Sequence, residues 1–266
     1  STFLYTMRER EIILDIFELV SGARMMTTYV RPGGLWRDVP VEFEKAVRDF
    51  LALMPRRLAE YDALLTKNTI FLERTRNIGV ISGEDAIRYG LSGPVLRGSG
   101  VAHDLRKDAP YSGYEQYDFN IPTQTAGDIY ARYLVRVQEM HESLKIVRQA
   151  LDNLPYGSVR SNNRKFVPPP RSELGTSMEA VIHHFKLWTE GFSVPRGAVY
   201  AATESPRGEL GVYLEGDGGP KPYRIHFNTP TFANLQALPL MVRKAFVADV
   251  VGVIGSIDIV LGDADR

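Results

Sequence analysis

The 266-residue chain carries 32 basic and 32 acidic side chains, and 44% of its residues are hydrophobic. This balance provides no overall field that would draw the chain to nucleic acid, and it predicts no basic face for coating a membrane. The absence of cysteine excludes disulfides, thiolate nucleophiles and cysteine-held metal clusters within this chain. The composition supports one substantial hydrophobic core or two small ones.

The sequence begins without an initiator methionine or a signal peptide at Ser1, so we expect a domain cut from a longer chain. Its longest weakly polar stretch, 247–260, contains Asp249 and Asp258. That stretch is also shorter than the roughly 20 apolar residues that a membrane-spanning helix needs. Any association with a membrane is therefore expected to depend on a partner.

Residues 1–151 predict part of a helical bundle. A helix over 3–20 should end at Ser21-Gly22, because glycine suits the left-handed cap, and Pro32-Gly33-Gly34 predicts a loop. Two longer helices are indicated by apolar residues at steps of three and four, which should pack against each other. A short helix is expected after Ser82. The two apolar stripes comprise Phe43, Val47, Phe50, Met54, Leu58, Tyr61 and Leu65 (with Pro55 as a point of bending), and Ile129, Tyr133, Val137, Met140, Leu144, Val147 and Leu151.

The remaining residues predict an extended connector over 152–175, rich in Pro, Asn and Arg, and a third segment over 176–266. Thr176 to Glu179 has the form of a capping box and predicts a helix to about Glu190. Three short strands joined by turns then predict a small antiparallel meander, followed by an apolar helix and an acidic tail. The predicted class is therefore mainly α with a small antiparallel β element, or α+β. The strands are expected at 199–203, 209–214 and 223–227, the turns at 205–208 and 217–220, and the final helix at 246–255.

A self-contained active site is not recognisable in the sequence. The glycine-rich run Gly93–Gly100 lacks the spacing of a dinucleotide-binding loop. His183 and His184 are adjacent in a predicted helix and point about 100° apart, so they are not expected to share a metal ion. We therefore expect no metal site and no self-contained catalytic set.

Two polar segments are unusual. In the first, 204–209, Arg207 occupies a tight turn with a carboxylate on either side, although an ordinary solvated turn explains this pattern equally well. In the second, the C-terminal tail, three carboxylates would repel one another if exposed and change their pKa if buried. A frayed acidic terminus is the alternative, but the apolar residues 259–261 argue against it. The three carboxylates are Asp258, Asp263 and Asp265.

Short runs spread along nearly the whole chain occur in a characteristic order: Arg8–Glu18, Tyr29–Gly34, Leu96–Val101, Asp104–Arg106, Tyr111–Glu115, Ser177–Lys186, Thr189–Gly191, Glu204–Gly211 and Asp258–Arg266. In this order they resemble the family of 49-kDa-type subunits (the D subunits) of the respiratory NADH–quinone oxidoreductase, complex I. The colinearity of the runs carries the resemblance, because no single run is decisive.

The resemblance implies a peripheral-arm subunit with a helical bundle like that of the large subunit of [NiFe] hydrogenases. In hydrogenases, cysteine pairs hold the nickel–iron centre, whereas the matching segment here, from Asp258 on, has no cysteine, so that centre should be absent. In complex I the equivalent space is the quinone cavity, close to the last iron–sulfur cluster. The resemblance gives Arg207 a role at this cavity. It gives Glu209, Asp258, Asp263 and Asp265 a role in passing charge toward the membrane subunits.

Two departures from the family pattern concern residues near the cluster and the quinone. The headgroup-binding His and Tyr of the family lie upstream of Ser1. The family often has Met-His-x-x-Tyr before the Arg-Pro-Gly-Gly loop, with the His facing the last cluster. In this chain the run is 25–29, with Met26 at the His position. Met26 is therefore the expected near-cluster residue, and the usual link between cluster reduction and a proton is not expected.

The function implied is a wall of the quinone-reduction cavity of a proton-translocating NADH–quinone oxidoreductase, on the cytoplasmic face of the bacterial plasma membrane. We expect no cofactor bound by this chain itself, which should be inactive alone. NADH, flavin, iron–sulfur clusters and a quinone would be used in or with other subunits, including a cluster-bearing neighbour and a membrane-arm subunit. One alternative is a hydrogenase-type enzyme, which the lack of cysteine disfavours. A non-catalytic scaffold is the other, and the sequence leaves it open.

Overall fold

The computed structural model describes residues 2–265 and groups them into two compact units. The first unit takes residues up to Met54 together with 153–198 and 214–224, and the second takes 55–152, 199–213 and the residues from Ile225 on. Each unit is therefore assembled from segments that are far apart in the sequence. The division at 151 and 175 remains a prediction about the order of segments along the chain.

The first unit begins with the predicted N-terminal helix, which ends as expected: Gly22 has a φ of +78°, and its N–H donates to Glu18 O at 2.7 Å. Arg37 donates to the carbonyls of Leu19 and Val20, the last turn of the same helix, at 2.9 and 2.8 Å. The Pro-Gly-Gly run forms the predicted loop, here within a small hairpin. The elements are α1 (Thr2–Ser21), β1 (Val30–Arg31), β2 (Gly34–Leu35), α2 (Glu42–Tyr61, which continues past this unit), the 3₁₀ turn Arg171–Glu173 and α8 (Met178–Thr189).

Helix α8 differs from the prediction in its start and in its apolar face. Its N-cap is Ser177, whose Oγ accepts from Ala180 N at 3.3 Å, so the capping box predicted from Thr176 is wrong by one residue. The expected apolar stripe does form, but its side chains are exposed, Phe185 by 62% and Trp188 by 74%. The helix therefore leaves an apolar face on the surface of the first unit.

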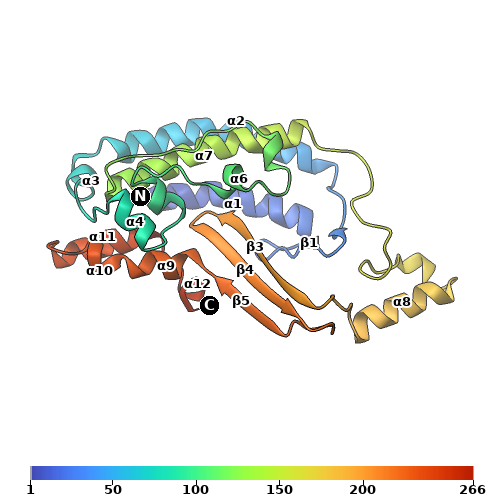
Figure 1. The fold of residues 1–266 in the computed structure, drawn as a ribbon. Coiled ribbons are helices and arrows are strands. Elements are labelled where there is room, and N and C mark those ends of the chain that lie inside the picture. Colours follow the sequence, from blue (N-terminus) through green and yellow to red (C-terminus); the bar gives the residue numbers. More distant parts are fainter. Residues whose placement is uncertain (1, 266) are drawn as a thin grey trace. The chain divides into compact units, whose positions relative to one another are not determined.

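The second unit contains a chain of short helices laid on one long helix, with α5 and α11 both packed on α7 (Figure 1). Its hydrophobic core comprises Ile81, Ala86, Leu91, Val95, Leu96, Ile129, Ala237, Met241, Val253 and Ile257. Before the sheet its elements are the end of α2 after Pro55, the π-helical turn Asp62–Thr66, α3 (Thr69–Glu73), α4 (Gly83–Arg88, capped by Ser82 as expected), α5 (Gly93–Arg97), α6 (Leu105–Asp108), the 3₁₀ turn Tyr114–Gln116 and α7 (Ile129–Asp152).

Helix α7 has the predicted extent but buries a different face. Met140 and Val147 of the predicted apolar stripe are each 38% exposed, so the stripe is wrong along the middle of the helix. Arg132 and Val135 are instead completely buried. A guanidinium group can be buried at this cost only if its N–H groups find partners, and this face of α7 leads to the polar site described below.

The three predicted strands form one sheet in the order β3, β4, β5, with bounds close to the predicted ones. Pro206 and Arg207 form the turn between the first two strands, as expected. The final helix also forms, and the acidic tail continues into one more helical turn. The class is confirmed as helical with a small antiparallel β element. These elements are β3 (Gly197–Ser205), β4 (Gly208–Gly216), β5 (Arg224–Asn228), α9 (Pro230–Gln236), α10 (Leu238–Met241), α11 (Val247–Ile257) and α12 (Leu261–Asp265).

Candidate functional site: a buried arginine–carboxylate network

Arg97 is the centre of a polar network in the second unit. It is the last residue of α5, and its side chain is 1% exposed. Its Nε and Nη2 lie 2.8 and 2.6 Å from Glu139 Oε1 on α7. Its Nη1 donates to Glu204 Oε1 at 2.8 Å and to His103 O at 3.0 Å. An uncompensated buried cation costs several kcal/mol, so these partners are what allows Arg97 to lie inside the fold.

Asp104 and Arg106 form a second ion pair in the same network. Asp104 is fully buried at the N-terminus of α6, and its two oxygens accept from Arg106 Nε at 3.0 Å and Nη2 at 2.6 Å. Burial alone would raise the pKa of Asp104, but the hydrogen bonds and charge of Arg106, with the charge of Arg97, hold it below its usual value. Burial would likewise lower the pKa of Arg106, but Asp104 raises it. Both groups are therefore held in their charged forms.

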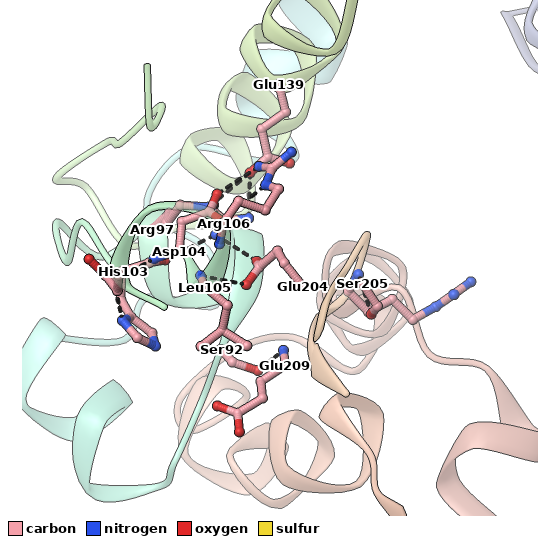
Figure 2. Close-up of polar contacts among 12 residues, drawn as sticks. Ser92, Arg97, His103, Asp104, Leu105, Arg106, Glu139, Glu204, Ser205 and Glu209 are labelled. Carbon is pink, nitrogen blue, oxygen red and sulfur yellow. Dashed lines mark hydrogen bonds and ion pairs between the residues drawn. The ribbon is translucent and has the colours of Figure 1, made fainter. Parts of the chain in front are cut away.

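Glu204 joins the sheet to this network. It lies near the end of β3, and its side chain is 5% exposed. Its Oε1 accepts from Arg97 and its Oε2 from Leu105 N at 3.3 Å, while its backbone N–H donates to the hydroxyl of Tyr111 at 2.9 Å. Figure 2 shows Glu204 reaching toward Arg97 and Leu105 from the strand. The network thus connects segments separated by about a hundred residues of sequence.

A cleft of about 560 Å³ lies beside the network. Arg136, one turn of α7 after Arg132, contributes to it, and its Nη2 is buried with no hydrogen-bond partner in residues 2–265. Burial lowers the pKa of Arg136, and the charge of Asp258 opposes this. Burial also raises the pKa of Glu139, more than the attraction of Arg97 lowers it. The cleft is lined by Arg97, Arg106, Tyr114, Arg136, Glu139, Met140, Ser143, Glu204, Ser205, Pro206 and Asp258.

The structure brings two of the sequence-predicted residues together at this cleft. Arg207 Nε donates to Asp258 O at 3.0 Å and lies 3.5 Å from Asp258 Oδ2. Asp258 ends α11 with a φ of +61° and lines the cleft. The backbone of the turn is held by Asn234, which donates to Arg207 O at 3.4 Å, and by Gly93, where a Cβ atom would overlap the backbone of Arg207. Arg207 therefore pairs with Asp258 rather than with the two glutamates of its own turn.

The other predicted site residues lie elsewhere. Glu209 Oε1 accepts from the Tyr200 hydroxyl at 2.8 Å, and in Figure 2 its side chain points away from Arg97. Asp263 Oδ2 accepts from Thr231 N at 3.2 Å at the start of α9. Asp265 is exposed in α12, and Met26 belongs to the first unit, where it is 89% exposed with a φ of +54°. The geometry thus separates the acidic tail into residues with different surroundings.

Sequence reasoning missed the centre of the site. Arg97, Asp104 and Glu204 lie in runs that served only to mark the resemblance, and Arg136 and Glu139 lie on a helix that was assigned an apolar stripe. One signal was available: Arg132, Arg136 and Glu139 follow each other at helical spacing and so share one face of α7. A charged row of this kind would have indicated a buried polar face if its partners had been known.

Two further findings concern residues 2–265. No three or more His, Cys, Asp or Glu side chains in this range are arranged to hold a metal ion. None of the helices in the same range combines the length and the apolar character needed to cross a membrane.

The fold and the site define a mixed α+β protein built around buried arginine–carboxylate pairs. The family model that describes the 49-kDa subunit of the respiratory-chain NADH dehydrogenase matches residues 1–266. The chain therefore belongs to this family.

Individual relatives, all D subunits of an NADH-quinone oxidoreductase, agree with this assignment. The chain is 60% identical to the first such protein of Roseiflexus castenholzii, covering all of this chain and 64% of that protein. It is 57% identical to the second one of Chloroflexus aurantiacus, of which it covers 66%, and 54% identical to that of Geotalea uraniireducens, of which it covers 68%. The chain thus spans about two thirds of the length of these relatives. Membership in this family also favours the complex I interpretation over the hydrogenase alternative.

Proposed function

We propose that the chain is part of a peripheral-arm subunit of a proton-translocating NADH–quinone oxidoreductase and helps to wall its quinone-reduction cavity. The family membership and the names of the relatives support this proposal. NADH, flavin and the iron–sulfur clusters belong in this proposal to other subunits. In residues 2–265 the carboxylates of the cleft face guanidinium groups, and the chain has no cysteine, so these residues do not fit a nickel–iron centre or a cluster of their own.

The pairing of Arg207 with Asp258 beside the cleft is the observation that carries the cavity role. A guanidinium at a cavity wall can donate to a quinone oxygen and stabilise the negative charge that develops there as electrons arrive. Asp258 beside it can hold or release a proton. Glu209, Asp263 and Asp265 complete the proposal as acidic groups that pass charge on toward the membrane arm.

The test replaces Arg207 by alanine in the full-length subunit within its complex. Quinone reduction per assembled complex should fall, while assembly is retained, because a partly exposed arginine contributes little to folding, about 0.5 kcal/mol. Arg88→Ala, which removes an exposed arginine of α4, is the matched control and should leave both unchanged. A photoreactive quinone should label the segments around Arg207 or Asp258.

The scaffold alternative makes the opposite prediction for the same variant. Its support is the packing of the Arg207 backbone against Gly93 and Asn234, which is structural in character. Loss of assembled complex with normal activity in each remaining complex, and no quinone label at this cleft, would establish the scaffold role.

Met26 carries the second part of the proposal. We place it next to the last cluster of a neighbouring subunit, at the cytoplasmic face of the bacterial plasma membrane and close to the membrane-arm subunit. A histidine there would gain a proton when the cluster is reduced, whereas methionine takes up none between pH 5 and 8. The cluster should therefore have a low midpoint potential with weak pH dependence. Redox titration of the intact assembly tests this, and a slope near about 59 mV per pH unit would contradict it.

A further inference from the structure

Arg136 differs from the other arginines around the cleft because it lacks a direct partner. Arg97, Arg106 and Arg207 each lie within 3.0 Å of an acceptor oxygen. The Nη2 of Arg136 is buried and, within residues 2–265, has no hydrogen-bond partner. The carboxylates that influence its charge are engaged elsewhere: Glu139 with Arg97, as Figure 2 shows, and Asp258 next to Arg207.

The chemistry of the cleft narrows what can supply the missing acceptor. A buried guanidinium without a partner is costly, and carboxylates match its forked geometry with two parallel hydrogen bonds. The space of about 560 Å³ is far larger than one water molecule requires, about 30 Å³ in the liquid. A phosphate with nearly two charges would meet three carboxylates at this cleft, those of Glu139, Glu204 and Asp258. A single carboxylate matches the single unpaired cation.

We propose that the cleft receives the carboxylate of an Asp or Glu side chain from a protein segment outside this chain, with Arg136 as its anchor. The neighbouring surface suits such a side chain, since Met140 and Pro206 offer apolar contact and Ser143 and Ser205 offer hydroxyl groups at the same cleft. The acidic segment belongs either to the part of the subunit present in the longer relatives or to another subunit. The inference rests on the proposed function only in placing this partner within the same assembly.

Site-specific photo-crosslinking in the intact complex tests the docking. A photoreactive amino acid at Ser143, which is exposed and lines the cleft, should cross-link to a peptide that contains Asp or Glu. The same group at Arg148, exposed on α7 but outside the cleft lining, is the positional control and should not label that peptide. Mass spectrometry of the product shows whether the peptide comes from the same subunit or from another one.

The contribution of Arg136 is measured in the same assay. Arg136→Gln should lower the cross-link yield at least about tenfold, because it removes the charge that pairs with the carboxylate. Arg136→Lys should give an intermediate yield, because lysine keeps the charge but loses the forked geometry. This second variant keeps the test valid if the glutamine variant fails to assemble.

Two outcomes would overturn the proposal. One is a cross-linked peptide without an acidic residue, or a yield that neither Arg136 variant changes. The other is loss of the cross-link when a short-chain quinone is added, with an increased KM for quinone in Arg136→Gln, which would make Arg136 a substrate-binding residue instead. The readout does not require quinone reduction, so it is independent of the Arg207→Ala test of the proposed function.

Discussion

The two units each contain a cleft with arginines, but they use the guanidinium group in opposite ways. The cleft of the first unit, about 470 Å³, is mostly aromatic, and the exposed Arg31 lies with its Cζ 5.6 Å from the ring centroid of Trp36. In the second unit the cleft is charged, and Arg97 is buried among carboxylates. An exposed arginine over a ring keeps its hydration, whereas a buried one depends on its partners. The cost of replacing an arginine should therefore differ sharply between the units.

Replacement of Arg97 by methionine should have the largest effect. It would leave the buried carboxylates of Asp104, Glu139 and Glu204 without their shared cation, at a cost of about 3–5 kcal/mol in the free energy of unfolding. Urea unfolding followed by far-ultraviolet circular dichroism measures this. Arg88→Met, in an exposed pair with Glu84, is the control and should cost at most about 0.5 kcal/mol. Equal losses in the two variants would contradict the comparison.

Arg132→Met should have the next largest effect, about 2–3 kcal/mol. Arg132 is fully buried and donates to Gly79 O at 2.9 Å, Gly127 O at 3.0 Å and Ser256 Oγ at 3.0 Å. Burial lowers the pKa of Arg132 to about 10, so it stays protonated at neutral pH, and its loss would leave these acceptors unpaired. Ser256→Ala, which removes one acceptor, should cost about 1 kcal/mol in the same unfolding assay. A loss from Arg132→Met no larger than that would show that water replaces the guanidinium.

The pH dependence of stability should differ in sign between two acids of the network. Because burial raises the pKa of Glu139, its contribution is complete below the ordinary value of 4.5 and is lost as pH rises through the raised folded pKa. Because the net effect lowers the pKa of Asp104, its contribution is complete above the ordinary value of 3.8 and is lost as pH falls through the lowered folded pKa.

Matched unfolding series of Glu139→Gln and Asp104→Asn test these signs against the parent chain. The stability advantage of the parent over Glu139→Gln should shrink as pH rises above 4.5. Its advantage over Asp104→Asn should grow as pH rises toward 3.8. Two slopes of the same sign would mean that the network does not separate the two acids.

The smallest effect is expected from Arg31→Gln in the first unit. Arg31 is exposed, and its stacking on Trp36 should contribute about 0.5–1 kcal/mol. Thermal unfolding of the purified chain measures the change. A loss above about 2 kcal/mol would show that this arginine, too, is needed for packing, and the contrast between the units would fail.

Periodicity predicted the helices α1, α2, α7 and α11 and the three strands, because each has a local apolar pattern. It failed where distant partners decide which face is buried. The inward face of α7 is polar because Glu139 meets Arg97, which lies 42 residues away in the sequence. Such pairing has no local signature. Arg207 and Asp258 were named because family resemblance covers both, and their contact across 51 residues could not be read from spacing.

Both tryptophans of the chain, Trp36 and Trp188, line the aromatic cleft of the first unit. The intrinsic tryptophan emission of this protein therefore originates in one unit only, and the unit with the arginine–carboxylate network contributes only tyrosine emission. A melting curve recorded by tryptophan emission would follow the first unit, whereas circular dichroism would follow both. Divergence of the two curves would reveal the units unfolding separately, and an added tryptophan at Tyr114 would give the second unit its own optical signal.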